Sequence, residues 1–286
     1  MPSLIDLRRR IRSVKNTEQI TKAMKMVASA KLRRAQERVL ASRPYSEIYT
    51  QMLSDVAGAV VSAGEEVSHP LLAVREQKRI LLVVVTSDRG LAGAFNSNIT
   101  KAGQVFIAAH PKAQFQIESI GRKGRDFFFR REMKISGEHI GVVDKARFAD
   151  AAAIARKVIG LYETEAVDAV YIIYNEFTSV MTQTLKVTQL LPLVVPQSAE
   201  PIDYIYEQPP GKLVQTLLPK FVETSIYRAM LESAASEHAA RMTAMDAATT
   251  NAAEVIEGLT LHLNRVRQAS ITKEIIEIVS GAAALG

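Results

Sequence analysis

Apolar residues near the start of the chain recur every three or four positions, as they do on one face of a helix. This stripe begins with Leu4, Leu7, Ile11 and Val14. We interpret it as shifting phase and continuing through apolar residues at Ile20, Met24, Val27, Leu32, Tyr45, Ile48, Met52, Val56 and Val60. Residues 1–63 are therefore predicted to form one long helix, with a bend at Pro44 because proline removes a helical hydrogen bond.

A second helical segment is predicted over residues 209–286. It opens with Pro209-Pro210-Gly211, a sequence that typically marks a boundary between elements. Its apolar and small residues follow a 3-4-3-4 spacing at Met245, Ala248, Ala252, Val255, Leu259, His262, Val266 and Ala269. A helix from Pro219 to Ser280 would be on the order of 90 Å long. Since no ordinary core buries such a stripe, we expect a long antiparallel coiled coil of the two terminal helices.

The middle of the chain, residues 71–208, has the pattern of an α/β domain. Residues 79–86 form a continuous apolar and β-branched run, which is typical of a strand covered on both faces. Further strands are predicted at 115–120, 169–174 and 180–190, and helices at 96–109 and 145–162. The fold class is therefore α/β, with a Rossmann-like domain inserted between the helices of the coiled coil.

Charge is concentrated at the N-terminus: residues 1–43 hold twelve basic and three acidic side chains, a net charge of +9. Such a segment favours an acidic partner, which can be a nucleic acid, an anionic membrane or an acidic protein surface. Base stacking is poorly supported, because the first aromatic residue of the segment is Tyr45. The chain has no cysteine, which excludes disulfides and thiolate chemistry. No apolar run is long enough to span a membrane.

The best candidate for a binding loop is Ser87–Asn96, which follows the first strand and contains Gly90 and Gly93. This is where open α/β sheets bind nucleotides, but the loop lacks the lysine and Ser/Thr of a P-loop. We interpret the glycines as allowing a tight turn. The five histidines, His69, His110, His139, His238 and His262, form no HExxH pair. His262 is expected to be packed and hydrogen-bonded in or beside the seam. No catalytic residue, cofactor or metal site is predicted.

Two motifs at opposite ends of the chain carry a family resemblance. Residues 13–28 (SVKNTEQITKAMKMVA) and 267–283 (RQASITKEIIEIVSGAA) resemble the gamma subunit of the F-type ATP synthase of bacteria. The loop at 86–96 and the segment Tyr204-Ile205-Tyr206-Glu207 are also similar to that family. The similarity runs in order over essentially the whole chain.

The resemblance implies a non-catalytic rotor shaft inside a ring of alpha and beta subunits, with the α/β domain against the epsilon subunit and the membrane ring of c subunits. Residues implied to contact the beta subunits are Lys22, Met24, Lys25, Arg267, Gln268, Thr272 and Glu277. Residues implied to meet the membrane ring are Tyr204, Tyr206 and Glu207. The expected location is the cytoplasmic face of the bacterial plasma membrane, without a membrane span of the chain's own.

Two other functions are open from the residues alone. A basic coiled-coil protein that binds nucleic acid would use the N-terminal charge, and its affinity would fall steeply with salt. A small nucleotide-binding enzyme would use the loop at Gly90 and Gly93. Neither function requires a C-terminal helix as long as the one predicted.

Overall fold

The computed structural model describes residues 3–62, 69–194, 204 and 206–283. Its contacts divide the chain into two compact units, one made of residues 1–28 and 242–286 and the other of residues 29–241. Helix α1 (Leu4–Ser62) and helix α5 (Pro210–Ala283) each contribute to both units. The predicted pairing of long terminal helices with an inserted α/β sheet is confirmed.

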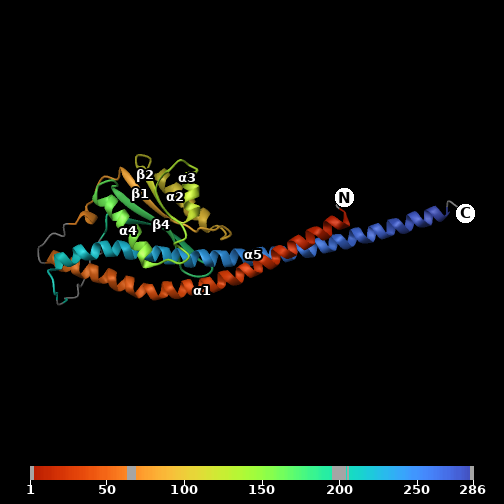
Figure 1. Cartoon of the computed structure of the whole chain (residues 1–286), viewed down its shortest axis with the longest axis horizontal. Helices are drawn as coiled ribbons and strands as arrows, with labels where there is room; N and C mark the ends of the chain where they lie inside the picture. The colour runs from red at the N-terminus through yellow and green to blue at the C-terminus, as the bar shows by residue number, and fades with distance from the viewer. Residues whose placement is uncertain (1–2, 63–68, 195–203, 205, 284–286) are drawn as a thin grey trace. The chain divides into compact units, whose positions relative to one another are not determined.

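The unit of residues 29–241 contains a five-stranded sheet in the order β3-β2-β1-β4-β5 (Figure 1). Its strands are β1 (Arg79–Val85), β2 (Gln114–Ile120), β3 (Lys134–His139), β4 (Ala169–Phe177) and β5 (Gln183–Leu191). The first four are parallel to their neighbours, whereas β5 pairs antiparallel with β4. The chain reverses its direction of travel across the sheet between β1 and β4, so this is a doubly wound arrangement.

Helices cover both faces of this sheet. Helix α2 (Phe95–Ala109) and helix α3 (Arg122–Phe129) lie together on one face (Figure 1). Their residues Phe95, Ile99 and Phe128 form one buried cluster with Leu82 and Ile117 of the strands. Helix α4 (Phe148–Glu163) covers the opposite face, and a short 3₁₀ turn (Pro70–Leu72) packs against it. The continuous apolar run of β1 follows from this double covering, because both faces of the strand are buried.

Helix α3, strand β3 and the short 3₁₀ turn of the sheet unit were not predicted. The sequence of β3, Lys-Ile-Ser-Gly-Glu-His, contains one large apolar residue, and the strand lies at the edge of the sheet. An edge strand needs less apolar surface than a central one, so its sequence signal is weak. Helix α4 begins at Phe148 rather than 145, and α5 begins at Pro210, where proline is well tolerated in a first helical turn.

Helices α1 and α5 pair antiparallel within this unit. The Tyr49 hydroxyl donates to the Leu217 carbonyl at 3.1 Å, while Arg43 reaches Glu232 at 3.2 Å. Buried residues of α1 at this pairing are Leu53, Val56 and Val60. The predicted seam residues Tyr45 and Ile48 are instead 60% and 69% exposed, so that part of the prediction was wrong.

The same two helices also pair within the unit of residues 1–28 and 242–286. Leu7, Thr21 and Ala28 of α1 are buried here, as are Met245 and Ala252 of α5. The hydroxyl groups of Thr21 and Thr249 lie 2.8 Å apart.

The register of this seam differs from the prediction at several positions. Ile20 and Val27 are exposed, because the buried positions of α1 continue the spacing of Leu7 without a shift and fall on Thr21 and Ala28. On α5, the less exposed positions include Met245, Thr249, Ala252, Ile256 and Leu259. Three residues of the predicted seam, Val255, His262 and Ala269, are exposed. The expectation of a packed His262 was therefore wrong. Apolar spacing alone did not locate a seam whose intermediate positions are partly polar.

Candidate coupling surfaces

The N-terminal motif residues lie on α1 in the unit of residues 1–28 and 242–286. Lys22 is exposed and Met24 is half-buried. Lys25 forms an ion pair with Asp246 of α5 at 2.5 Å, and the two side chains are 41% and 56% exposed. Of these three residues, Lys25 thus bridges the two helices, whereas Lys22 faces solvent.

The C-terminal motif residues Arg267, Gln268, Thr272 and Glu277 are all exposed on α5. Their interactions are local to the helix: the Thr272 hydroxyl donates to the Gln268 carbonyl at 2.9 Å, and Glu277 pairs with Lys273 at 3.5 Å. Arg267 lies roughly 30 Å along the helix axis from Asp246, at a rise of about 1.5 Å per residue. The structure therefore does not bring the N-terminal and C-terminal motif residues together.

Large apolar side chains are exposed around the C-terminal part of α5. Ile271, Ile275, Ile276, Ile278 and Val279 are between 48% and 70% exposed. In Figure 1 this part of α5 extends past the N-terminal end of α1, with which it shares a unit. A helix that exposes apolar residues on several sides is characteristic of a segment that another protein surrounds.

The tyrosine motif lies in the unit of residues 29–241, where Tyr204, Tyr206 and Glu207 are described and residue 205 is not. The Tyr204 hydroxyl donates to a carboxylate oxygen of Asp55 at 3.1 Å, and Gln51 donates to the other oxygen at 2.9 Å. Asp55 has no exposed surface. Partial burial and the hydrogen bond to Asp55 raise the pKa of Tyr204, so its phenol remains a donor over the physiological range. Tyr204 is thereby anchored to α1.

The rings of Tyr204 and Tyr206 lie 6.2 Å apart at an interplanar angle of 66°. Glu207 follows them and is exposed. The motif therefore presents one aromatic pair and one carboxylate beside the end of α1. Nothing in the spacing of the sequence pointed to Asp55 as the partner of Tyr204 or to Asp246 as the partner of Lys25.

The glycine-containing loop between β1 and α2 is held by its own polar groups. Asp88 accepts hydrogen bonds from the backbone amides of Arg122 at 3.0 Å and Gly141 at 2.9 Å. Asn96 bonds both the amide and the hydroxyl of Ser87. Gly93 has a φ of 54°, a left-handed conformation that glycine adopts without strain. This geometry matches the interpretation of the loop as a tight turn.

Titratable side chains also gather outside these motifs, for example around Glu118 and around Asp144. His139 and Lys157 both bond the buried Glu118, at 2.7 and 2.8 Å. His238 of α5 is buried and lies 3.0 Å from Asp144, which also pairs with Lys31 at 2.6 Å. Within the residues that the structure covers, no group of three or more His, Cys, Asp or Glu could hold a metal ion. Among the same residues, no helical segment combines the length and hydropathy that a bilayer crossing requires.

Comparison with known proteins gives consistent matches along the chain. The family model described as ATP synthase matches residues 3–285. The ATP synthase gamma chain of Solibacter usitatus is 61% identical over 284 residues, which are 99% of each chain. The ATP synthase gamma chain of Pelotomaculum thermopropionicum is 48% identical over 288 residues, with all of both chains covered.

Solved structures agree with this fold. A chain from the central stalk and c-ring of the Tetrahymena thermophila mitochondrial ATP synthase is 27% identical, with a TM-score of 0.59 over 80% of this chain and 99% of that chain. A chain from the rotor of the Euglena gracilis mitochondrial ATP synthase has a TM-score of 0.68 at 20% identity, covering 94% of this chain and 98% of that chain. The second likeness concerns the fold alone.

Proposed function

Because the chain belongs to the gamma-chain family of ATP synthase, whose members form the non-catalytic central stalk, we propose that it transmits torque between a membrane ring and catalytic beta subunits. It does so during proton-driven ATP synthesis or during ATP hydrolysis. The single observation that carries this proposal is the 61% identity to a gamma chain over 99% of both chains. The antiparallel pairing of α1 and α5 supports it.

The partners of this function are the alpha and beta subunits of the catalytic head, the epsilon subunit and the ring of c subunits. The Tetrahymena structure contains a central stalk together with a c-ring, which supports the last of these partners. The location that follows is the cytoplasmic face of the bacterial plasma membrane, where the chain is held through its partners.

Torque transmission requires that the shaft bind different conformations of the beta subunits with different free energies. The exposed residues Lys22, Arg267 and Glu277 offer charges for such contacts, and Met24 offers an apolar one. Gln268 and Thr272 add hydrogen-bonding groups on the same exposed helix. Lys25 is proposed to take part in these contacts as well, and its ammonium group also forms the ion pair with Asp246.

The aromatic pair of Tyr204 and Tyr206, with Glu207, is proposed to meet the membrane ring. The hydrogen bond from Tyr204 to Asp55 supports this role, since a contact that carries force must be anchored to a rigid element. Asp55 provides that anchor because it lies buried on α1.

Co-expression with the alpha and beta subunits of the same organism tests the function. A tagged copy is purified with and without these subunits, and ATP hydrolysis is measured in each preparation. We expect an inactive isolated chain and an active complex that holds one copy per ring of alternating alpha and beta subunits. Nucleotide turnover by the isolated chain, or failure to enter the ring, would overturn the proposal.

A further inference from the structure

Strand β4 continues beyond the end of its neighbour β1. The pairing of the two strands ends at Val84 with Ile173, whereas β4 extends to Phe177. Alternate residues of a strand direct their N–H and C=O groups to opposite neighbours. Asn175 and Phe177 therefore turn four backbone groups toward the space where β1 has ended. Both residues are buried, so these groups need partners within the protein.

Side chains of the two long helices supply all four partners. On α5, the Ser233 hydroxyl accepts from the Asn175 amide at 3.5 Å, and the Ser236 hydroxyl donates to the Asn175 carbonyl at 3.1 Å. Glu232 accepts from the Phe177 amide at 2.9 Å. On α1, Arg43 donates to the Phe177 carbonyl at 2.9 Å. Side chains thus replace the missing stretch of β1, and we call these four residues the β4 clamp.

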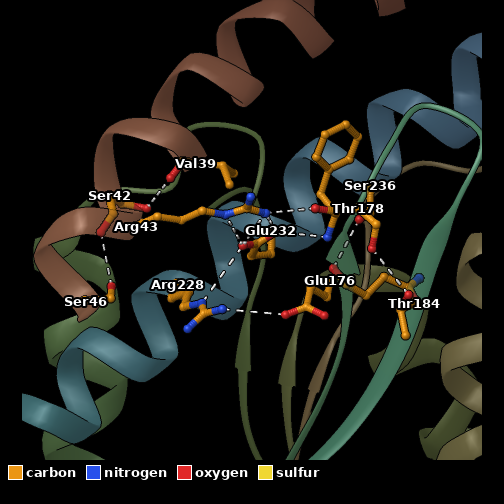
Figure 2. Close-up of polar contacts among 12 residues, drawn as sticks. Val39, Ser42, Arg43, Ser46, Glu176, Thr178, Thr184, Arg228, Glu232 and Ser236 are labelled. Carbon is orange, nitrogen blue, oxygen red and sulfur yellow. Dashed lines mark hydrogen bonds and ion pairs between the residues drawn. The ribbon is translucent and has the colours of Figure 1, made fainter. Parts of the chain in front are cut away.

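Glu232 is the centre of the β4 clamp. Arg43 of α1 and Arg228 of α5 both point toward its carboxylate (Figure 2). Their nitrogen atoms lie 3.2 and 3.9 Å from a Glu232 oxygen, and Arg228 also pairs with Glu176 at 3.5 Å. The Glu232 side chain is only 1% exposed, and a carboxylate at such a depth is stable only when it is paired and hydrogen-bonded. One side chain therefore joins the sheet, α1 and α5.

The β4 clamp lies where related folds bind ligands. In doubly wound sheets the ligand crevice is at the carboxyl ends of the strands, at the point where the strand order reverses. Here that point lies between β1 and β4. Helix α5 lies at this point: Ser236 bonds the end of β4, and Arg241 donates to the carbonyl of Gly90 at 3.1 Å in the loop after β1. A long helix of the same chain thus occupies the place of a ligand.

We propose that the β4 clamp is the rigid joint through which torque passes between the inserted sheet and the two long helices, with Glu232 as its positioning residue. This inference rests on the proposed function and names the residues that perform one step of it. Polar contacts on a strand edge are directional, so they resist sliding and twisting of the helices against the sheet. Apolar packing alone is not directional.

The test uses the whole enzyme in lipid vesicles and the soluble head. The main variant is Glu232→Ala. If it fails to fold, Ser236→Ala takes its place, because it removes only one hydrogen bond of the β4 clamp. Arg43→Met is compared with Arg43→Lys, which keeps the charge and a donor. The matched control is Glu223→Ala, since Glu223 is a nearly buried carboxylate of α5 whose ion pair, with Lys220 at 2.8 Å, stays within the helix.

Three quantities are measured: hydrolysis by the soluble head, proton pumping per ATP hydrolysed in vesicles, and hydrogen exchange at residues 175–177 in the assembled head. We expect Glu232→Ala to speed exchange at the Phe177 amide on the order of tenfold. We expect pumping per ATP to fall severalfold, while ATP hydrolysis by the soluble head stays near that of the head assembled with the unmodified chain. Arg43→Lys should recover most of the pumping that Arg43→Met loses.

Equal pumping per ATP in Glu232→Ala and Glu223→Ala would overturn the clamp as a torque joint. Unchanged exchange at residues 175–177 would also overturn it. Either result would leave the proposed function intact, provided that the unmodified chain couples hydrolysis to pumping. Absence of coupling with the unmodified chain would instead refute the function itself.

Discussion

Lys157 of α4 and Glu118 of β2 form an ion pair of 2.8 Å across one face of the sheet, and the Glu118 side chain has no exposed surface. Lys157 also donates to the carbonyl of Ser136 at 2.8 Å, and the His139 ring donates to the Glu118 carboxylate at 2.7 Å. Strands β2 and β3 are thus tied to the helix that covers them. This network stabilises the edge of the sheet that β3 forms.

Replacing Lys157 with methionine should destabilise the chain by roughly 3 kcal/mol, because a buried carboxylate would lose its main partner. Urea unfolding of the dilute purified chain measures this change. The control is Lys101→Met, which removes an exposed lysine from helix α2. A Lys157→Met variant as stable as the Lys101→Met variant would show that the pair contributes nothing.

The same substitution should also change how the free energy of unfolding depends on pH in the acid range. Burial alone would raise the pKa of Glu118, but the hydrogen bonds from His139 and Lys157 outweigh it and hold the pKa below its ordinary value of 4.5. The resulting stability is present above that value and is lost as the pH falls through the lower pKa of the folded chain. Lys157→Met should therefore flatten this part of the pH dependence.

His238 should make stability depend on pH between neutrality and mild acid. Burial lowers the pKa of His238 below its ordinary value of 6.5, and Lys31 and Arg241 lower it further, while Asp144 opposes them. The unfolded chain then binds the proton more readily than the folded one. Stability is therefore full above pH 6.5 and declines as the pH falls below it. His238→Gln should reduce this decline, whereas His262→Gln, at an exposed position, should leave it unchanged. Equal declines in both variants would contradict the prediction.

Substitutions at Lys25 and Asp246 distinguish an effect on the pairing of α1 with α5 from an effect on contact with a beta subunit. The pair is exposed, so Lys25→Ala should change stability by less than about 1 kcal/mol, and less still at high salt. Asp246→Asn breaks the same pair but keeps the lysine. If Lys25 contacts the beta subunits, coupling in the assembled enzyme should fall in Lys25→Ala and not in Asp246→Asn. Equal losses would assign the effect to the helix pair.

The exposed apolar residues at the C-terminal part of α5 should make the isolated chain associate with itself. Ile275 and Ile278 are 55% and 70% exposed. Replacing both with serine should keep the chain monomeric at higher concentration, since it removes apolar surface from the helix. Sedimentation measures this change, and the yield of complex with alpha and beta subunits should fall in the same variant. Unchanged assembly would show that these side chains do not contact the ring.

Much of the fold could be predicted from periodicity. The long apolar run of β1 and the long helical pattern after Pro210 are strong local signals, and both elements formed as expected. The edge strand β3 and the helix α3 gave no such signal, because polar residues dominate β3 and α3 spans only eight residues. The seam of the long helices was misplaced at Val27 and Ile48 because Thr21 and other polar residues share it.

The contacts that organise the candidate surfaces were harder to predict. Arg43 and Glu232 are separated by 189 positions in the sequence, and Tyr204 and Asp55 by 149. Each of these residues alone is compatible with a solvated helix face or loop. Their pairing follows from the return of the chain to the same helix pair, which local patterns do not encode. The contacts of the motif residues with partner subunits stay predictions.

Observation of single molecules tests the rotor most directly. The chain contains no cysteine, so one cysteine introduced at an exposed position of the inserted domain, such as Lys112, gives a unique attachment point for a bead. The head is fixed to a surface through its beta subunits, and ATP is added. We predict continuous rotation of the bead in one direction, at a speed that follows the ATP concentration. ATP hydrolysis at a normal rate with a bead that does not turn would contradict the proposal that this chain is a rotating shaft.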